Sequence, residues 1–563
     1  MNLTSDFVTS EAAFLYLPQP KPVAKHKSSA PSHEEVLDSA ITWWVSLGLM
    51  LGALLIPLAT AEVPPLTDYP NHLARCYLLA FGNSDPILRQ MFTAHWRVIP
   101  NIAIDLILPG LMHVFSPLRA GRIMLAFCLL VPTTGAIALS RAYFRRRSLW
   151  QMAAGFAAFN VLFLMGLMNF QIAIGVAMWA AAAWIRYRES HPVATIISAI
   201  LLAPAIFFFH LFGFCFYMLL IGSYEFFIIF EKRLQSWDDV RYAAIRACAL
   251  VAALIVPAIL YSASPLEKIS FAPVWLSLPK KLYFLFDSQL AYSSLFDLLL
   301  AATILAFVIY CVINGRARVS KAALICSTAL LCIYLVTPET FKGVHLVDTR
   351  LPVMLGFMIF AGFMPRGLSS RENHAAGALF ALLFVARIAF ITNVWAESQR
   401  DITNLRQVIE PIAPGSRVMT ADVVYHDNPG WFSAMPMSRN LPDVSPTYWH
   451  IASFVLLDRH AFWPSIFAEE SQQPITMNEP YRDLTTGGHP PPDYLYLAMP
   501  QVPAKELAIF PFLEDWQNKF DYVLVLNAEG APELDNFQSK KLQLVNRRGI
   551  AALFRVKKIA RLH

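Results

Sequence analysis

The sequence predicts a polytopic α-helical membrane protein with about eleven transmembrane helices and a C-terminal α/β extracytoplasmic domain. Three observations lead to this fold class. Of the 563 residues, 56% are hydrophobic and only 15% are charged, whereas an ordinary soluble domain has about 25% charged residues. Apolar runs long enough to cross a membrane recur as far as residue 393. Beyond that residue, prolines, acidic residues and short strand-like runs replace them.

Residues 1–41 are polar and contain Pro, Lys and Ser, so we expect a disordered cytoplasmic tail and no cleavable signal peptide. Apolar runs of roughly 15–23 residues follow. They lie near 42–60, 119–140, 149–165, 168–185, 194–209, 212–230, 244–262, 293–314, 322–337, 351–365 and 375–393. The break between the third and fourth runs is short enough for the two to be counted as one.

Basic residues gather in every second loop between these runs. The clusters are Arg141 with Arg145, Arg146 and Arg147; Arg186 with Arg188; Lys232 with Arg233, Arg241 and Arg246; Arg316 with Arg318 and Lys321; and Arg366 with Arg371. Loops rich in Lys and Arg stay in the cytoplasm. With an odd number of spans, we therefore expect a multi-pass protein of a bacterial inner membrane, with a cytoplasmic N-terminus and a periplasmic C-terminal domain.

The net charge of +6 does not indicate nucleic-acid binding, because the basic residues lie in these short loops. The seven cysteines form no CxxC pair and no Cys/His metal spacing, so neither a disulfide framework nor a zinc site is predicted.

Three domains are predicted: the tail 1–41, a transmembrane domain 42–393, and a periplasmic α/β domain 394–563. The outer loop 61–118 is long for a connector and mixes apolar with polar residues, which suits helices lying in the membrane interface. In the last domain, strand-like runs near 417–420, 494–497 and 522–526 precede a hairpin around Asn546-Arg-Arg-Gly549. A lid or acceptor-binding role suits this domain better than catalysis.

The densest polar cluster follows the first apolar run, in the segment Glu62-Val-Pro-Pro-Leu-Thr-Asp68-Tyr-Pro-Asn-His72-Leu-Ala-Arg75. If a helix begins at Pro70, His72 and Arg75 share one face and Asp68 stands at the helix N-terminus. A carboxylate there can act as a general base, and a nearby Arg or His can bind phosphate. The alternative is structural: Asp68 caps the helix, and Arg75 reaches out to lipid headgroups.

Further polar residues fall on the same predicted face of the membrane. They are Asn101 and Asp105 in the outer loop, Asn169 at the turn between the third and fourth runs, His210 at the end of the fifth run, and His345, Asp348 and Arg350 before the tenth; Glu225 lies deeper, in the sixth run. Ionisable groups at membrane depth are costly and point to function. The alternatives are a satisfied interfacial histidine for His210 and, for Asp348 and Arg350, a salt bridge that locks their loop.

The order of an acid after the first span, a loop with interfacial helices, many further spans and an outer domain resembles the GT-C superfamily of integral-membrane glycosyltransferases. The suspected relatives are bacterial proteins related to aminoarabinose and protein-mannose transferases, in an uncharacterised subgroup. The similar blocks are Pro65-Leu-Thr-Asp68-Tyr-Pro-Asn-His72-Leu-Ala-Arg75, Asn169-Phe170, His210-Leu-Phe-Gly213 and Asp348-Thr-Arg350-Leu-Pro352. In architecture the resemblance covers about residues 42–393.

This resemblance implies transfer of a sugar from a polyprenyl-phosphate carrier to a lipid, glycan or protein acceptor at the periplasmic face, with inversion at the anomeric carbon. By analogy, Asp68 would be the catalytic base. His72, Arg75, His210 and Arg350 are the candidates for binding the donor phosphate. Some relatives use a divalent cation with paired acids. Here Glu62, Asp68 and Asp105 could supply oxygen ligands, but an adjacent acidic pair is missing, so metal dependence stays open.

Other functions compete with this one. A secondary transporter should show inverted repeats and broken helices, and the sequence shows no such symmetry. A non-catalytic component of a polysaccharide export or assembly system would use the outer domain as a docking surface. An O-antigen ligase or polymerase would rest on Arg and His residues in a large late loop.

Overall fold

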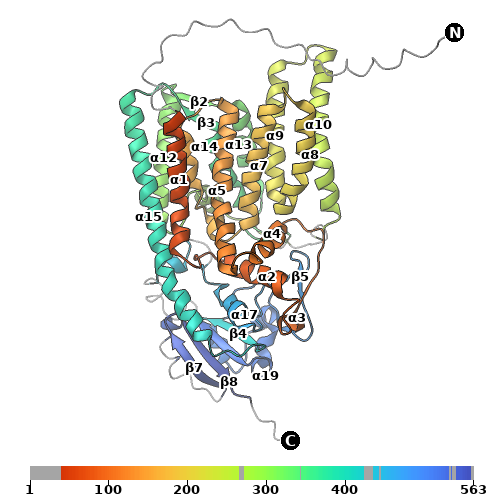
Figure 1. Ribbon diagram of the computed structural model, residues 1–563, viewed down its shortest axis with the longest axis vertical. Coiled ribbons are helices and arrows are strands. Elements are labelled where there is room, and N and C mark those ends of the chain that lie inside the picture. Colours follow the sequence, from red (N-terminus) through yellow and green to blue (C-terminus); the bar gives the residue numbers. More distant parts are fainter. Residues whose placement is uncertain are drawn as a thin grey trace, which may run out of the picture.

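The computed structural model describes residues 40–265, 272–342, 344–423, 435–442, 446–531, 534 and 541–558. Long helices stand side by side in one part of the molecule, and the C-terminal sheet lies beyond one end of them (Figure 1). Within the described residues, eight helices are long and apolar enough to cross a membrane. They are α1 (Ala40–Thr60), α5 (Pro117–Phe144), α7 (Met168–Tyr187), α8 (Pro192–Phe209), α9 (Leu211–Lys232), α10 (Trp237–Ser262), α12 (Ser294–Ile313) and α15 (Ser370–Ile409). The chain is a multi-pass α-helical membrane protein, as its sequence predicts.

The other three predicted spans take different forms. Runs 322–337 and 351–365 become two shorter apolar helices, α13 (Lys321–Val336) and α14 (Arg350–Gly362). The run 149–165 does not form one α-helix: a 3₁₀ helix (Leu149–Ala157) precedes a single turn, α6 (Val161–Leu164). The cause is Asn160, whose buried amide donates to Ala157 O at 2.9 Å and accepts from Phe163 N at 3.0 Å. The count of eleven spans stays a prediction.

Helices α5 and α7 approach each other closely through two glycines. A Cβ on Gly135 would lie 2.6 Å from Gly175 O, and a Cβ on Gly175 would lie 2.5 Å from Pro132 N. Small residues let two backbones meet in this way inside membranes. The rigid α5–α7 contact fixes the N-terminal end of α7, where Asn169 lies.

The outer loop consists of short elements: α2 (Tyr69–Phe81), α3 (Leu88–Met91), β1 (Phe92–Ala94) and α4 (Ala103–Met112). Strand β1 pairs antiparallel with β5 (Ile475–Met477), which comes from the C-terminal part of the chain. The contact continues through Thr93 Oγ1, which donates to Asn478 Oδ1 at 2.6 Å. The outer loop is therefore built into the C-terminal region as well as onto the helices.

The C-terminal sheet has four strands in the order β4-β6-β8-β7. Strands β4 (Val418–Asp422) and β6 (Tyr522–Leu526) are parallel, whereas β8 (Ala551–Val556) is antiparallel to both β6 and β7 (Leu542–Arg548). The hairpin predicted around 546–549 is β7–β8. The run 494–497 forms a 3₁₀ helix and no strand, because the Asp493 side chain accepts from Leu495 N and starts a turn there.

The remaining elements are short. Helix α11 (Leu278–Phe284) leads into a buried loop before α12, and β2 (Ala317–Val319) pairs with β3 (Phe363–Pro365) at the far end of the bundle (Figure 1). Helices α17 (Phe454–Arg459), α18 (Ala504–Ile509) and α19 (Trp516–Lys519) lie within the C-terminal region. Helix α15 is one continuous helix of 40 residues, and the predicted boundary at 393/394 falls inside it. The same helix contacts both β7 and β8. The predicted domain limits stay predictions.

Candidate functional site

Asp68 lies immediately before α2, and its backbone is clamped from one side. The N–H groups of Thr67 and Asp68 donate to Leu164 O at 3.1 Å and Met165 O at 3.0 Å. Gly166 faces this contact with a φ of +88°, and a Cβ there would lie 2.8 Å from Tyr69 N. Only glycine combines that backbone conformation with so close an approach. The Asp68 side chain makes no capping hydrogen bond to α2, so helix capping does not explain this residue.

The Asp68 carboxylate faces a histidine that sequence reasoning missed. Asp68 Oδ1 lies 3.3 Å from His450 Nε2, and the side chains are 23% and 3% exposed. His450 Nδ1 lies 3.2 Å from Asn71 Nδ2, although these two residues are 379 positions apart. Asp68 is thus partly open to solvent and partly covered by the C-terminal region. Nothing in the sequence around His450 marks it as a partner of Asp68.

Arg75 and Asp105 form a buried pair that joins α2 to α4. Arg75 Nε and Nη2 donate to Asp105 Oδ1 at 2.7 Å and Oδ2 at 3.0 Å. Their side chains are 2% and 1% exposed, so Arg75 does not reach lipid headgroups. The two candidates predicted for phosphate and metal binding neutralise each other in this structure.

His72 follows Asp68 by one helical turn and is half-buried. Its ring centroid lies 5.2 Å from that of Phe467, which His450 also contacts at 4.9 Å. Burial, and next the positive charge of Arg75, lower the pKa of His72 well below its usual 6.5. The imidazole is therefore neutral at pH 7 and offers no charge to a phosphate. Its Nδ1 has no hydrogen-bond partner among the described residues.

Arg350 is a buried cation whose hydrogen-bonding capacity is only partly used. One guanidinium nitrogen donates to the backbone oxygens of His345 at 3.0 Å and Leu346 at 2.5 Å. Its Nε is buried and has no partner in the part of the chain that the structure describes. Asp348, the partner expected for Arg350, pairs instead with Lys281 Nζ at 3.0 Å. The Asp348–Arg350 salt bridge considered above is therefore not formed.

His210 and Arg350 converge on Phe212. The Arg350 guanidinium lies 5.4 Å from the Phe212 ring centroid, and the His210 ring lies 5.9 Å from the same ring. His210 Nδ1 accepts from Phe212 N at 3.1 Å, which leaves Nε2 as the protonated nitrogen of the neutral ring. The His210 ring centroid also lies 5.4 Å from that of Phe170. His210 is thus fixed as a neutral donor beside a cation.

Asn169 and Asn101 hold the outer loop against α7 and α8. Asn169 Oδ1 accepts from Ile104 N at 3.0 Å, and its Nδ2 donates to Asn101 O at 2.7 Å. Asn101 N in turn donates to Phe208 O at 3.1 Å. The Asn169 side chain and the Asn101 backbone thus position the outer loop.

Glu62 and His345 lie apart from these contacts. Glu62 is 52% exposed and lies 3.5 Å from Arg406 of α15, where it lines a polar cavity of about 420 Å³. His345 is 76% exposed and lies 3.6 Å from Glu339. The possible metal ligands Glu62, Asp68 and Asp105 point to three different partners. No group of three His, Cys, Asp or Glu side chains that could hold a metal ion occurs within the described ranges.

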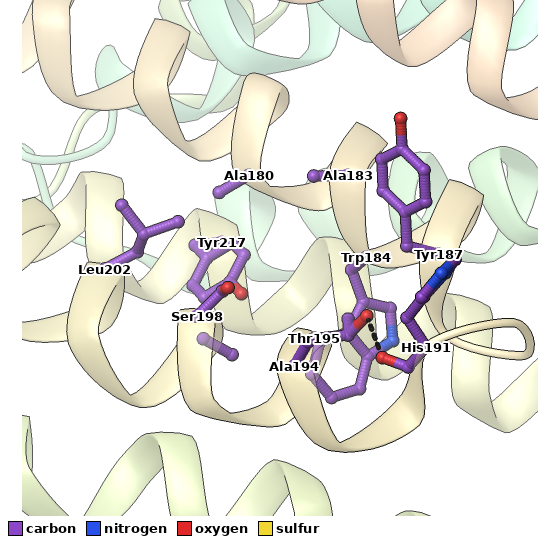
Figure 2. Close-up of a pocket in the computed structure, with 11 residues that line it drawn as sticks. Ala180, Ala183, Trp184, Tyr187, His191, Ala194, Thr195, Ser198, Leu202 and Tyr217 are labelled. Atoms are coloured by element: carbon purple, nitrogen blue, oxygen red, sulfur yellow. Dashed lines mark hydrogen bonds between the residues drawn. The ribbon is translucent and has the colours of Figure 1, made fainter.

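A second cavity, of about 290 Å³, lies between α7, α8 and α9 (Figure 2). Alanines, Trp184, Leu202 and Tyr217 line most of it, and His191 and Thr195 stand at one end. The lining includes no carboxylate and no guanidinium. This cavity contains none of the predicted site residues.

No protein-family model matches the chain, and no curated protein matches it. Among solved structures, the chain is similar to ArnT from Cupriavidus metallidurans, both bound to undecaprenyl phosphate and in the apo state. The identity is 11% in each case, the TM-scores are 0.47 and 0.48, and the likeness covers 92% of this chain and 98% of the other. At this level it assigns no activity, so the chemistry has to follow from the residues around Asp68 and Arg350.

Proposed function

We propose that this protein is a membrane glycosyltransferase that moves a sugar from a polyprenyl-phosphate carrier to an acceptor hydroxyl at the outer face of a bacterial inner membrane. The single observation that carries the proposal is Asp68. Its backbone is held by two hydrogen bonds, its carboxylate is partly exposed, and among the described residues only one of its oxygens has a neighbouring donor. The sequence resemblance to GT-C enzymes supplies the reaction class. The N-terminus is placed in the cytoplasm and the C-terminal region in the periplasm, on the charge of the loops.

In this reaction, the acceptor hydroxyl attacks the anomeric carbon while Asp68 takes its proton. A new bond forms between the acceptor oxygen and that carbon, and the bond from the carbon to the phosphate oxygen breaks with inversion. The polyprenyl phosphate leaves with the electron pair. A carboxylate positioned as a general base contributes about 10²- to 10⁴-fold to such a step. Asp68 is suited to it because the protein restrains its backbone and leaves one oxygen accessible.

The leaving phosphate needs a cation, and Arg350 is the candidate with free capacity. Arg75 is committed to Asp105, and His72 is neutral at pH 7. Arg350 has a buried Nε with no partner among the described residues, and backbone oxygens hold its other end. A guanidinium fixed in this way stabilises charge that develops on a phosphate oxygen. His210 adds a neutral N–H next to it.

The test uses purified protein in lipid with a panel of polyprenyl-phosphate sugars, and it follows release of the lipid phosphate and sugar transfer. Wild type is compared with Asp68→Asn and with Asp458→Asn, a matched control. Asp458 is another outer aspartate of similar exposure, 25% against 23%, and it pairs with Arg406. We expect turnover in wild type and Asp458→Asn and its collapse in Asp68→Asn. Full activity in Asp68→Asn would remove the assignment.

A further inference from the structure

The orientation of the Asn71 side chain is fixed by two backbone groups of the C-terminal region. Asn71 Oδ1 accepts from Phe467 N at 2.8 Å, and Asn71 Nδ2 donates to Ser465 O at 2.8 Å. If the amide oxygen and nitrogen were exchanged, the NH₂ group would face the N–H of Phe467 and the amide oxygen would face the carbonyl oxygen of Ser465, and neither pair can form a hydrogen bond. The NH₂ group of Asn71 is therefore the part that faces His450.

This orientation selects one tautomer of His450. The second hydrogen of the Asn71 NH₂ group points to His450 Nδ1, 3.2 Å away. An NH₂ group only donates, so Nδ1 has to present its lone pair, and the ring proton resides on Nε2. That nitrogen is the one that lies 3.3 Å from Asp68 Oδ1. The chain of contacts thus aims an N–H at the carboxylate.

We infer that His450 is a positioning residue for Asp68, an inference that rests on the proposed function. Its Nε2–H donates to Asp68 Oδ1, holds the carboxylate in one rotamer, and leaves Oδ2 to take the acceptor proton. The distance of 3.3 Å tightens when the acceptor binds, as catalytic hydrogen bonds commonly do. His450 does not itself take the proton, because the N–H of Asn71 occupies Nδ1. The C-terminal region therefore completes the catalytic site.

If His450 had only a structural role, the packing of its ring against neighbouring side chains would be sufficient. The His450 ring packs on Phe467 at 4.9 Å and on Trp463 at 6.1 Å between centroids, and a phenylalanine would satisfy both contacts. The two ring nitrogens are the feature that phenylalanine lacks, and one of them faces Asn71 while the other faces Asp68. This difference separates a packing role from a positioning role.

The kinetic test compares His450→Phe with His450→Gln in the full-length protein. The Nε2 amide of glutamine can replace the ring Nε2–H, whereas phenylalanine keeps only the packing. We expect His450→Phe to lower kcat about 10- to 100-fold with an unchanged KM for the donor, and His450→Gln to recover most of the loss at equal Tm. An unchanged kcat in His450→Phe, with Asp68→Asn inactive, would overturn the positioning role and leave the proposed function standing.

A second measurement does not depend on turnover. Solid-state ¹⁵N spectra of histidine-labelled protein in lipid report which ring nitrogen carries the proton, and the His450 signal is identified by its absence in His450→Gln. We expect a protonated Nε2 and an unprotonated Nδ1, with the selection lost in Asn71→Leu. A proton on Nδ1 would overturn the inference whatever the transferase assay shows. Absence of turnover in wild type with every donor would instead count against the proposed function alone.

Discussion

Two groups of buried charge in this molecule look alike in the sequence and differ in the structure. The first surrounds Glu225, whose oxygens accept from Arg246 Nε at 2.5 Å and Trp184 Nε1 at 2.7 Å. Arg246 also reaches Glu189, at 2.5 Å. The second consists of Asp68, which faces His450, and Arg350, which lies beside Phe212. Glu225 lies 15 positions further along α9 than His210, about 22 Å of helix.

The difference is in unused hydrogen-bonding capacity. Each oxygen of Glu225 has a donor, and the group holds α7, α9 and α10 together. Asp68 has one oxygen without a described partner, and Arg350 has a buried Nε without one. An ionisable residue at membrane depth is expected to be functional by default. In this protein, the residues whose hydrogen-bonding groups are all paired have a structural role, and those with an unpaired group form the candidate site. Four measurements test this difference between the two groups.

Thermal stability should differ most between variants of the two groups. Arg246→Met leaves the buried Glu225 with only the more distant Arg188, whose Nε lies 3.8 Å from Glu225 Oε1, and breaking a buried pair costs about 3–5 kcal/mol. Arg350→Met removes a cation that pairs with no described carboxylate, so its Tm should fall much less. Thermal unfolding in a detergent or lipid of fixed composition measures both. Adding Glu225→Leu to Arg246→Met should restore only part of the loss, because the buried Arg188 then loses its carboxylate. Equal Tm values for the two single variants would contradict the difference between the two groups.

The second effect is on turnover. Here substitution of Arg350 should matter more than substitution of Arg246, the reverse of the order expected for stability. Loss of one preorganised donor to a developing negative charge costs about 10²- to 10³-fold in kcat, which we expect for Arg350→Met. Arg350→Lys should recover only part, because a single ammonium nitrogen cannot occupy both the position that bonds the backbone oxygens and the position of the unpartnered Nε. Turnover of the folded fraction of Arg246→Met should stay near wild type. A fully active Arg350→Met would move the phosphate site elsewhere.

The third effect tests the clamp on Asp68. Gly166→Ala places a Cβ 2.8 Å from Tyr69 N at a φ of +88°, a conformation that costs a residue with a side chain about 1–3 kcal/mol. The shift is transmitted to the Asp68 backbone, and we expect kcat to fall by about tenfold or more. Gly222→Ala is the control, because a Cβ there meets nothing within 4 Å. Equal kinetics for the two variants would show that the clamp is not needed.

The smallest effect is a pH dependence of stability through His72. Because its folded pKa lies well below its unfolded value of 6.5, the unfolded chain binds one more proton as the pH falls below about 6.5. The contribution of His72 is therefore fully present above that pH and is lost on acidification. We expect the fall in Tm between pH 7 and pH 5 to be smaller in His72→Gln than in wild type. Identical slopes would mean that His72 is accessible to protons in the native state.

The sequence predicted the helices well wherever one apolar run formed one regular helix. The prediction was wrong at 149–165, because hydropathy indicates that a run is buried but does not indicate which kind of helix it forms. In this run the side-chain amide of Asn160 bonds to the backbone and separates two short helices. The prediction was also wrong at 494–497, where four apolar and aromatic residues suit a strand or a 3₁₀ turn equally. In both places one local side-chain hydrogen bond decides the backbone.

Only some residues of the candidate site could be identified from the sequence. Asp68 and Arg350 were identifiable because each is an ionisable residue beside an apolar run. The pairing of Arg75 with Asp105 was not, since both looked available until α2 and α4 packed together. His450 was out of reach for the same reason: its significance comes from Asn71, 379 positions away, and no local spacing encodes a contact of that kind.

The pairing of β1 with β5 cannot form until most of the chain has been synthesised. Thr93 and Asn478, which bond across that pair, are 385 positions apart. At ~5–20 residues per second, a ribosome needs roughly 20–80 s to go from one to the other. For most of that interval the first outer loop has neither the strand that pairs with β1 nor the histidine that faces Asp68. Under the proposed function, a nascent chain that has already inserted most of its helices still lacks the histidine that positions its base, and the C-terminal region completes the site last.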